Sequence, residues 1–428
     1  MTELPKGWVE TTLGCVAEWG SGGTPKSTDR DYYGGGIPWA VIGDLNDATV
    51  ASTAATVSDA GLTNSSAKLV EPGTVLVAMY GSIGKLGIAG QRMATNQAIA
   101  FANGRAGVAG NRFLFWFLRW QRSALATAGK GATQKNISQT VLKAWPIRLP
   151  PPAEQDRIVA AIEEQLSRLG AAEANLNACQ GRIPGLRRAA LQAAFPYHWP
   201  AKPLVEVADP DRPICYGILK PRSENGVIPY VEVRSIRDGA IDVNSLHRTT
   251  TALHDEFRRS ELRTGDVVLA IRGSWDRAAV VPSSLDGANV SRDVARIAPL
   301  DSLHPAFLAY FLESPRAHAY YARHARGVGV RGINIGDLRR LDVPIPDLEE
   351  QRAAVEALEL QLSLISALAV ALGNGRLRSD HLRRAILTEA FAGRLVPQDP
   401  SDEPASELLA RVGAERSAAT KSRPRKRA

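Results

Sequence analysis

The chain has 428 residues, 44% of them hydrophobic, and a formal net charge of +8. This length is too great for one ordinary core and predicts two or more domains. The N-terminus lacks the apolar stretch of an export signal, and no run of 18 apolar residues occurs, so neither export nor a membrane span is indicated. The cysteines Cys15, Cys179 and Cys215 form no CxxC pair. Their spacing argues against a disulfide framework or a zinc site and favours the cytoplasm.

The positive charge does not identify a function by itself. Its densest run is the C-terminal "KSRPRKRA", which holds five basic residues. Such runs are most often solvated ends that add weak, nonspecific attraction to polyanions. The seven histidines are scattered without the spacing of metal ligands. Nucleic-acid binding therefore has to be judged from where individual cations lie.

Residues 1–150 predict a mixed α/β globule. Short extended runs rich in Val, Ile and Thr lead to a glycine-bounded hairpin and then to the aromatic helix "NRFLFWFLRW". A Gly/Pro-rich loop near the start carries Thr24 and Lys26, and a second glycine-bearing loop, "GKGATQKNIS", carries Lys130 and Lys135. Cations on such loops suit contacts to phosphates or to guanine edges, although ordinary solvated surface charge is the alternative.

The stretch "AMYGSIGKLG", residues 78–87, looks at first like a phosphate-binding loop. A P-loop needs four residues between its first glycine and the Gly-Lys pair, followed by Ser or Thr. Here Met79 stands where that first glycine is needed, and Leu86 follows Lys85, so the hydroxyl that would hold magnesium is missing. A glycine-rich turn between two strands is the better interpretation, and a nucleotide hydrolase remains an alternative.

A long-period repeat organises the rest of the chain. "EQDRIVAAIEEQL" from Glu154 returns as "EQRAAVEALELQL" from Glu350, and "LRRAALQAAF" from Leu186 returns as "LRRAILTEAF" from Leu382. Both matches have the same offset, with no insertion between them. The sequence therefore predicts an internal duplication.

Both copies predict long helices, preceded by the proline-rich stops "RLPPPAEQ" and "VPIPDLEEQ". Apolar residues at spacings of three, four and seven, among them Leu186, Leu368 and Leu382, indicate a coiled-coil seam, and about 42 residues would span roughly 60 Å. Pro184 with Gly185, and Gly373 to Gly375, predict a kink or break. Two matched glutamines either fix the register between the helices or lie on the solvent edge. The predicted pairing residues are Ile158, Ile162, Gln165, Leu169, Leu358, Gln361, Ile365 and Leu372.

The segment between the helices repeats the first globule more faintly. "VEPGTVLVAMYGSIGKLGIA" aligns with "LRTGDVVLAIRGSWDRAAVV", so Lys85 corresponds to Arg277, and a Gly-Ser turn is kept where a nucleotide loop would not be. Lys130 corresponds to Arg326 and Lys135 to Arg331. The candidate DNA contacts from both halves are Thr24, Lys26, Tyr80, Lys85, Lys130, Lys135, Tyr216, Lys220, Arg272, Arg277, Arg326 and Arg331.

The predicted order is globule (1–150), helix (151–195), globule (196–346), helix (347–391) and C-terminal segment with a basic tail (392–428). This sequence resembles the DNA specificity subunits of type I restriction-modification systems. The resemblance rests on "GGTP", "IPW", "GLTNSSAKLVEPGTVL" before "GSIGK", "KNIS", "PPPAEQDRIV", "PIPDLEEQ" and "AFAGRLVPQDPSDEPASELLARV". The second half departs from the family pattern, because it lacks "NSSAKL" and has "GSWDR" in place of "GSIGK".

The resemblance implies an α+β fold with a pseudo-twofold internal repeat. Two target recognition domains, each reading half of a split double-stranded DNA target, would be separated by two long antiparallel coiled-coil helices. It implies docking of two methyltransferase subunits on those helices, with restriction subunits recruited through them, and no membrane. The chain itself would be non-catalytic and bind no cofactor, and adenosylmethionine, ATP and magnesium would belong to the partners. An orphan specificity or scaffold protein without such partners is the alternative.

Overall fold

The computed structural model describes residues 4–129, 135–219, 226–273, 277–327 and 331–421, except for the side chains after residue 414. The chain divides into two compact units. Unit 1 comprises Met1–Asn175 together with Arg376–Ala428, and unit 2 comprises Leu176–Gly375. Unit 1 is therefore built from both ends of the chain, whereas unit 2 is one continuous segment.

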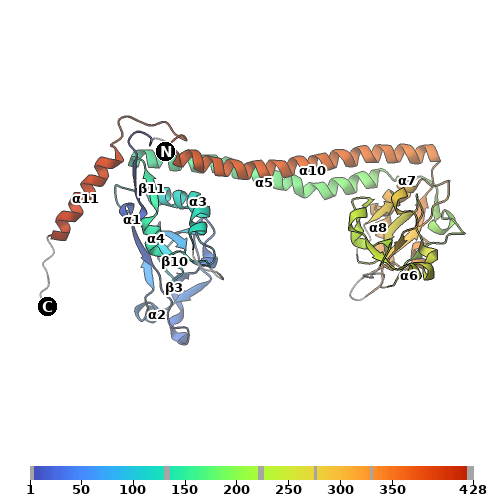
Figure 1. Cartoon of the computed structure of the whole chain (residues 1–428), viewed down its shortest axis with the longest axis horizontal. Helices are drawn as coiled ribbons and strands as arrows, with labels where there is room; N and C mark the ends of the chain where they lie inside the picture. The colour runs from blue at the N-terminus through green and yellow to red at the C-terminus, as the bar shows by residue number, and fades with distance from the viewer. Residues whose placement is uncertain (1–3, 130–134, 220–225, 274–276, 328–330, 422–428) are drawn as a thin grey trace. The chain divides into compact units, whose positions relative to one another are not determined.

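Two sheets and a short strand pair form the β structure of unit 1 (Figure 1). The five-stranded sheet has the order β2 (Ala17–Ser21), β10 (Ile99–Gly104), β7 (Val75–Ala78), β8 (Leu86–Ala89), β4 (Thr49–Val50). The four-stranded sheet has the order β5 (Ala55–Val57), β3 (Tyr33–Ala40), β9 (Met93–Thr95), β6 (Lys68–Val70), and β1 (Val9–Thr12) pairs with β11 (Pro146–Leu149). The stretch that resembled a phosphate-binding loop is the antiparallel hairpin β7–β8, as the turn interpretation predicted.

The helices of unit 1 are α1 (Leu13–Val16), α2 (Asp59–Thr63), α3 (Asn111–Ala128) and α4 (Gln139–Ala144), with the 3-10 turns η1 (Arg30–Tyr32) and η2 (Ile42–Asp44). Apolar residues of α3 at helical spacing, including Phe113 and Phe117, are buried against the five-stranded sheet. Phe391 from the far end of the chain stacks on Trp120 in the same core.

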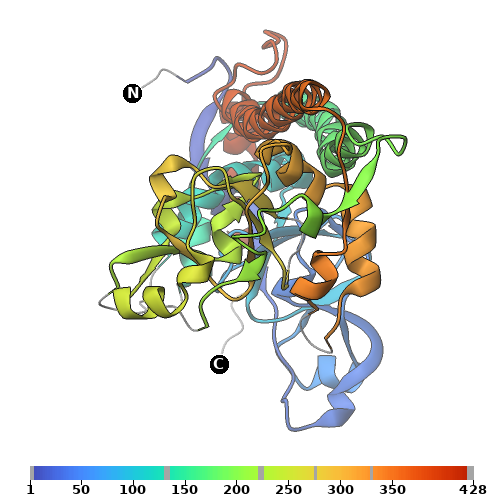
Figure 2. The ribbon, with the colours of Figure 1, turned by 90° about the vertical axis from the view of Figure 1, so that its right-hand side faces the viewer.

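Unit 2 repeats this plan with shorter elements (Figure 2). Its four-stranded sheet has the order β13 (Cys215–Tyr216), β21 (Val294–Ile297), β18 (Val267–Ala270), β19 (Ala278–Val280). Further strands are β17 (His247–Thr249), β14 (Ile228–Val231) and β20 (Asn289–Val290), then β15 (Ile236–Arg237) with β16 (Ala240–Ile241), and β12 (Ala201–Pro203) with β22 (Asp342–Pro344). The 3-10 turns are η3 (Leu204–Glu206), η4 (Val233–Ser235), η5 (Val243–Ser245), η6 (Arg258–Ser260) and η7 (Ser283–Leu285).

The shorter helices of unit 2 are α6 (Thr251–Glu256), α7 (Pro305–Leu312), α8 (Pro315–His324) and α9 (Ile335–Leu338). Helix α7 packs on β18 and β19 as α3 packs on β7 and β8. Phe307 and Phe311 of α7 are fully buried, like Phe113 and Phe117 of α3. The aromatic helix of each half therefore has the same role, which is to cover the sheet.

The two long helices are α5 (Pro152–Ala193) and α10 (Leu348–Phe391), and each contributes one part to each unit. In unit 1, Glu173 of α5 accepts hydrogen bonds from Ser379 and, at 2.7 Å, from Arg383 of α10. In unit 2, Gly375 of α10 faces Leu176 of α5 so closely that an added Cβ would lie 3.3 Å from the leucine side chain. The pairing is antiparallel. The mixed α/β units and the paired helices confirm the predicted fold class.

Neither long helix is broken at Pro184–Gly185 or at Gly373–Gly375, where a kink or break was expected, and a kink at either place stays a prediction. Pro184 lies inside α5, which continues to Ala193. The glycine at 375 is explained by the close approach of Leu176, because a larger residue there would crowd the helix pair. Glycine in this position serves packing and does not end the helix.

A matched pair of buried glutamines ties the start of each long helix to its globule. Gln155 accepts a hydrogen bond from the Gly110 amide at 3.1 Å and donates to the Val108 and Pro150 carbonyls at 2.8 and 3.0 Å. Gln351 accepts from the His304 amide at 2.8 Å and donates to the Ser302 and Pro346 carbonyls at 3.0 and 2.9 Å. The glutamine of the repeated "EQ" pair is therefore a clamp between helix and globule.

Several predicted pairing residues lie in the cores of the globules. Ile158 and Ile162 are fully buried in the core that contains α3, and Leu358 is buried in the core that contains α7. Leu169 and Ile365 are partly buried against the same cores. Leu372 is buried, whereas Gln165 and Gln361 are exposed. Leu186, Leu368 and Leu382, also placed in the seam by their spacing, are exposed.

The outward face of α10 is apolar and exposed in unit 2. Leu360, Leu364, Leu368 and Val370 expose 64%, 64%, 43% and 63% of their surface. By length and composition α10 is apolar enough to cross a membrane, with a window of mean hydropathy 1.7 that is 17% buried. The window is not one uninterrupted apolar run, so a membrane-crossing helix was not expected from the sequence. One such helix is weak evidence for a membrane span.

The C-terminal segment returns to unit 1. Helix α11 (Ala405–Lys421) begins with Ala405, whose amide donates to the Gly7 carbonyl at 2.9 Å. Leu408 of the same helix is buried in the unit 1 core, and Asp402 pairs with Arg157 of α5 at 2.6 Å. The segment after α10 thus completes unit 1 and is more than a tail.

Candidate nucleic-acid interface

Four loops meet at one surface of unit 1, defined here as the loop surface of unit 1. They are the loop after β2, the β7–β8 turn, the loop between β9 and β10, and the segment before α4. The Met79 amide donates to the Ala98 carbonyl at 2.8 Å, and the Gly81 amide donates to the Lys135 carbonyl at 3.2 Å. Tyr80 forms an isolated antiparallel bridge with Asn136 and is 41% exposed.

The loop after β2 joins this surface through very close backbone contacts. The Gly23 amide donates to the Thr95 carbonyl at 2.9 Å, and a Cβ on Gly22 would lie 2.0 Å from that carbonyl oxygen. Only glycine fits there. The adjoining Thr24 is exposed and donates to Gln97, and Lys26 is exposed. The predicted residues Thr24, Tyr80 and Lys135 are therefore brought together by the fold.

Unit 2 has the same construction, which we call the loop surface of unit 2. The Ile271 amide donates to the Asp293 carbonyl at 2.9 Å, and the Gly273 amide donates to the Arg331 carbonyl at 3.1 Å. Both bonds match those of Met79 and Gly81. Arg272 bridges to Gly332 as Tyr80 does to Asn136. The duplicated backbone thus presents different side chains at matching positions.

A cavity of about 500 Å³ lies at the loop surface of unit 2. Four arginines and a tyrosine contribute to it. Its lining includes Tyr216, Arg259, Arg272, Arg292 and Arg326, with Phe257, Leu219 and Asn334 between them. Tyr216 and Leu219 are 47% and 49% exposed. Guanidinium groups with exposed aromatic and apolar surface are the side chains that DNA-binding proteins use for phosphates, guanine edges and bases.

The arginines of this cavity are only loosely neutralised. Arg272 and Arg292 both approach Asp293, at 3.8 and 3.6 Å, and their side chains are 52% and 49% exposed. Arg259 stacks over the Tyr216 ring, 5.9 Å from its centroid. One carboxylate shared by two arginines at these distances leaves net positive charge at the surface. Such a surface attracts an anionic ligand.

Lys85 and Arg277 occupy matching positions and make matching structural contacts. The Lys85 ammonium donates to the Ile42 carbonyl, and the Arg277 guanidinium donates to the Val233 carbonyl, both at 3.2 Å. Each cation therefore braces a neighbouring 3-10 turn, which gives it a structural reason to be kept. Contact of either residue with DNA stays a prediction.

The remaining predicted residues are placed less closely. Arg326 lines the cavity of unit 2. Arg331 is exposed, and its carbonyl accepts the hydrogen bond from the Gly273 amide after β18. Lys130 and Lys220 lie outside the described residues.

Sequence reasoning missed several residues that share these surfaces. Arg259 and Arg292 line the cavity of unit 2, and Gln97 and Asn136 adjoin Tyr80 and Thr24 in unit 1. Gln97 and Arg292 occupy matching loops. Gln97 directly precedes Ala98, whose carbonyl accepts from the Met79 amide after β7. Arg292 directly precedes Asp293, whose carbonyl accepts from the Ile271 amide after β18. Alignment of those loops could have singled out this pair, but Arg259 has no counterpart in the first half.

The sequence model of one protein family, the type I restriction modification DNA specificity domain, matches residues 5–177 and 217–366 of this chain. The chain belongs to this family. It is a DNA specificity subunit of a type I restriction-modification complex, and the family is a non-catalytic one within that complex. The two matched stretches correspond to the two copies of the internal repeat.

One of the known relatives matches nearly the whole specificity subunit, and others match parts of it. The EcoBI specificity subunit of Escherichia coli is 25% identical over 96% of this chain and 93% of its own length. The EcoKI specificity subunit of Escherichia coli K12 is 23% identical over 69% of each chain. The EcoAI specificity subunit of Escherichia coli is 66% identical over 35 residues.

Solved structures share the fold. One is a chain from a structural study of complex assembly and conformational transition in the type I R-M system. It superposes with a TM-score of 0.73 at 21% identity, covering 92% of this chain and 100% of its own. The HsdS subunit from Thermoanaerobacter tengcongensis superposes with a TM-score of 0.61 at 21% identity, covering 92% and 98%. Across the part of the specificity subunit that the structure describes, no group of three or more His, Cys, Asp or Glu residues could hold a metal ion.

Proposed function

We propose that the specificity subunit recognises a bipartite double-stranded DNA target, one half-site at the loop surface of each unit. The observation that carries this proposal is the pair of matching loop frameworks with different side chains at equivalent positions. Tyr80 with Gln97 in unit 1 corresponds to Arg272 with Arg292 in unit 2. Two equivalent surfaces with different hydrogen-bonding groups suit two different base sequences.

We further propose that α5 and α10 fix the gap between the half-sites. Both helices are continuous, and the start of each is bonded to its own globule through Gln155 or Gln351. Half-site spacing in DNA-binding proteins follows from protein geometry.

The helices also offer a docking face for the methyltransferase subunits, with the restriction subunits bound through them. Leu360 and Leu364 are 64% exposed, whereas the matching residues of α5 are Glu164 and Arg168, which pair with each other at 2.6 Å. An exposed apolar face of this kind usually marks an interaction site. We assign it to a methyltransferase subunit and place the protein in the cytoplasm, where its DNA and partners are found.

Adenosylmethionine, ATP and magnesium are assigned to the partner subunits in this proposal. Adenosylmethionine binding to the specificity subunit alone, compared with binding to the assembled methyltransferase, tests this assignment. Binding to the isolated chain would contradict the assignment.

Methylome sequencing of cells with and without this gene tests the function directly. The expected result is a methylated motif with two short half-sites separated by a fixed gap, lost on deletion of the gene. A continuous motif would contradict the two-surface proposal. DNA binding without any gene-dependent methylation would instead favour the orphan protein.

A further inference from the structure

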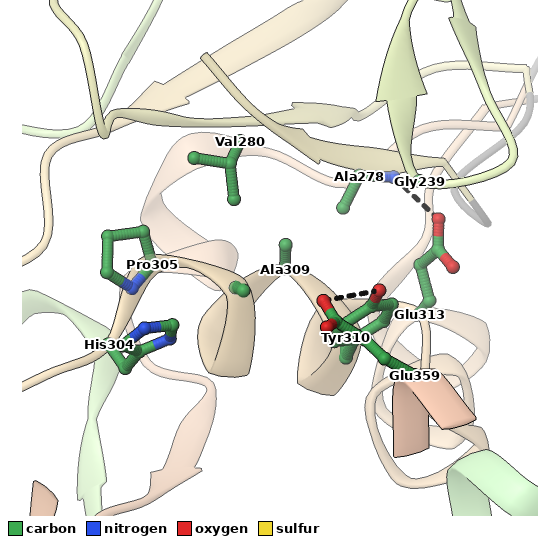
Figure 3. Close-up of a pocket in the computed structure, with 10 residues that line it drawn as sticks. Gly239, Ala278, Val280, His304, Pro305, Ala309, Tyr310, Glu313 and Glu359 are labelled. Carbon is green, nitrogen blue, oxygen red and sulfur yellow. Dashed lines mark hydrogen bonds between the residues drawn. The ribbon is translucent and has the colours of Figure 1, made fainter. Parts of the chain in front are cut away.

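A second cavity, of about 420 Å³, lies in unit 2 away from the loop surface (Figure 3). It is bounded by β19, by helix α7 and by Glu359 of α10. Its lining is apolar on one side and acidic on the other. The lining residues are Gly239, Ala278, Val280, His304, Pro305, Ala306, Ala309, Tyr310, Glu313 and Glu359.

Comparison with unit 1 explains why the cavity exists. The Gln155 clamp on Gly110 and the Gln351 clamp on His304 set the register between α3 and α7. In that register Ala306 stands where α3 has Arg112, and Ala309 stands where α3 has Phe115. The hairpins set a second register, because Leu86 pairs with Val77 as Ala278 pairs with Leu269.

Three positions that carry large side chains in unit 1 therefore carry alanine in unit 2. They are Ala278 for Leu86, Ala306 for Arg112 and Ala309 for Phe115. Leu86 and Phe115 are 0% and 3% exposed, so in unit 1 these positions fill the core. At the cavity of unit 2, alanine therefore replaces two side chains that fill the core of unit 1, Leu86 and Phe115.

The acidic partner of the missing arginine is still present. In unit 1, Glu163 of α5 accepts from Arg112 Nε at 2.7 Å and from Trp116 Nε1 at 3.0 Å. The matching residue in the repeat is Glu359 of α10, at the mouth of the cavity. Among the described residues, it accepts one hydrogen bond, at 3.3 Å from the Tyr310 hydroxyl.

The other polar groups of the cavity are hydrogen-bond acceptors or hold an acceptor in place. Glu313, 7% exposed, accepts from the Ala278 amide at 3.2 Å and from Arg187 at 2.8 Å. Burial, and then the charge of Glu359, raise the pKa of Tyr310 to about 12, so its hydroxyl stays a donor to Glu359. Within the described part of the chain, His304 Nδ1 is buried without a hydrogen-bond partner.

We propose that this cavity binds the side chain of an arginine presented by another protein. The guanidinium would bind Glu359 as Arg112 binds Glu163, over the Tyr310 ring, while its alkyl stem packs on Ala306 and Ala309. Stacking of this kind occurs in unit 1, where Arg119 lies over the Trp116 ring, 5.2 Å from its centroid. A planar guanidinium suits such a site better than an ammonium ion. No residue of this cavity belongs to the loop surfaces, so the proposal is independent of DNA recognition.

The test titrates the full-length chain with n-butylguanidinium as the probe. Binding is measured from the NMR spectrum of the protein. Butylammonium tests the need for a planar cation, and butylurea is a neutral analogue of similar shape. We expect a Kd of about 1 mM for butylguanidinium, a usual affinity for so small a ligand. Butylammonium should bind about tenfold more weakly, and butylurea should not bind.

Two variants restore the side chains of unit 1 and should abolish binding. Ala306→Arg supplies an arginine from the chain itself, and Ala309→Phe fills the apolar floor. Circular dichroism checks that each is folded, and if one variant does not fold the other decides. No binding of butylguanidinium to the wild-type chain overturns the proposal. Equal binding of butylurea, or unchanged binding to a folded variant, overturns it as well.

Discussion

Arg292 gives the sharpest test of the loop surface of unit 2, since it lines the arginine cavity and little in the protein depends on it. Its side chain is 49% exposed, and its recorded ion pair is with Asp293 at 3.6 Å. Exposed pairs of this kind contribute about 0 to 1 kcal/mol to stability. Arg292→Ala should therefore leave the protein folded, so a loss of DNA binding would report on contact with DNA.

The size of the loss depends on what the arginine contacts. One phosphate contact lowers the slope of log K against log salt by about 0.9. At about 0.15 M salt that contact is worth about a fivefold change in affinity, or ~1 kcal/mol, equally for all DNA sequences. A bidentate contact to a guanine would cost about 1 to 3 kcal/mol and relax specificity at one base.

Fluorescence anisotropy with a DNA duplex that carries the methylated motif, titrated at several salt concentrations, measures both quantities. Arg292→Lys separates the two cases, because lysine keeps the charge for a phosphate and loses the bidentate geometry for a guanine. Arg323→Ala is the matched control, since Arg323 is an exposed arginine in the last turn of α8 and does not line the cavity.

We expect Arg326→Ala to behave like Arg292→Ala, because both arginines line the same cavity. If both alanine variants kept the wild-type affinity and salt slope, the cavity would not be part of the DNA-binding surface. A loss of equal size in Arg323→Ala would show that net charge alone is responsible.

Three further outcomes are expected. Gln351→Leu should lower the free energy of unfolding by about 3 kcal/mol, since it leaves three backbone groups unpaired, one of them buried and two partly buried; an unchanged thermal midpoint would contradict the clamp. Burial raises the pKa of Glu154 above 4.5 despite its bond to Trp8, so ionisation costs stability as pH rises through the folded pKa. Glu154→Gln should therefore stabilise the protein at pH 7 but not at pH 4, and calorimetry showing equal gains at both would refute this. Deleting about four residues from each long helix should shorten the gap in the methylated motif by about 1 to 2 base pairs, and an unchanged gap would rule out the spacing role.

The duplication made most of the fold predictable from one sequence. Residues that repeat at a fixed offset, such as Gln155 and Gln351, are those that pack or clamp in both halves. The hairpin turn was predictable because a Gly-Ser pair recurs at the same place in both halves. In the structure Gly81 and Gly273 both have a positive φ, of 64° and 81°, which glycine adopts readily.

The outward face of the helices and the cavity arginines were less predictable. Helical spacing cannot separate a seam residue from one that faces a partner, so Leu368 and Leu382 matched the heptad pattern although they are exposed. Arg259 was missed because its position depends on how η6 folds towards Tyr216, far away in the chain.

The discontinuity of unit 1 has a consequence for biosynthesis. Its core contains Phe391 and Leu408, and the Gly7 carbonyl accepts from the Ala405 amide. The N-terminal residues of unit 1 are therefore synthesised long before the C-terminal residues that they contact. Unit 2 is the continuous segment Leu176–Gly375 and can close its core before translation ends. At about 5 to 20 residues per second, the segment Arg376–Ala428 takes about 3 to 10 s to follow. We therefore expect the second recognition unit to fold first on the ribosome, with the N-terminal strands held incomplete until the chain is released.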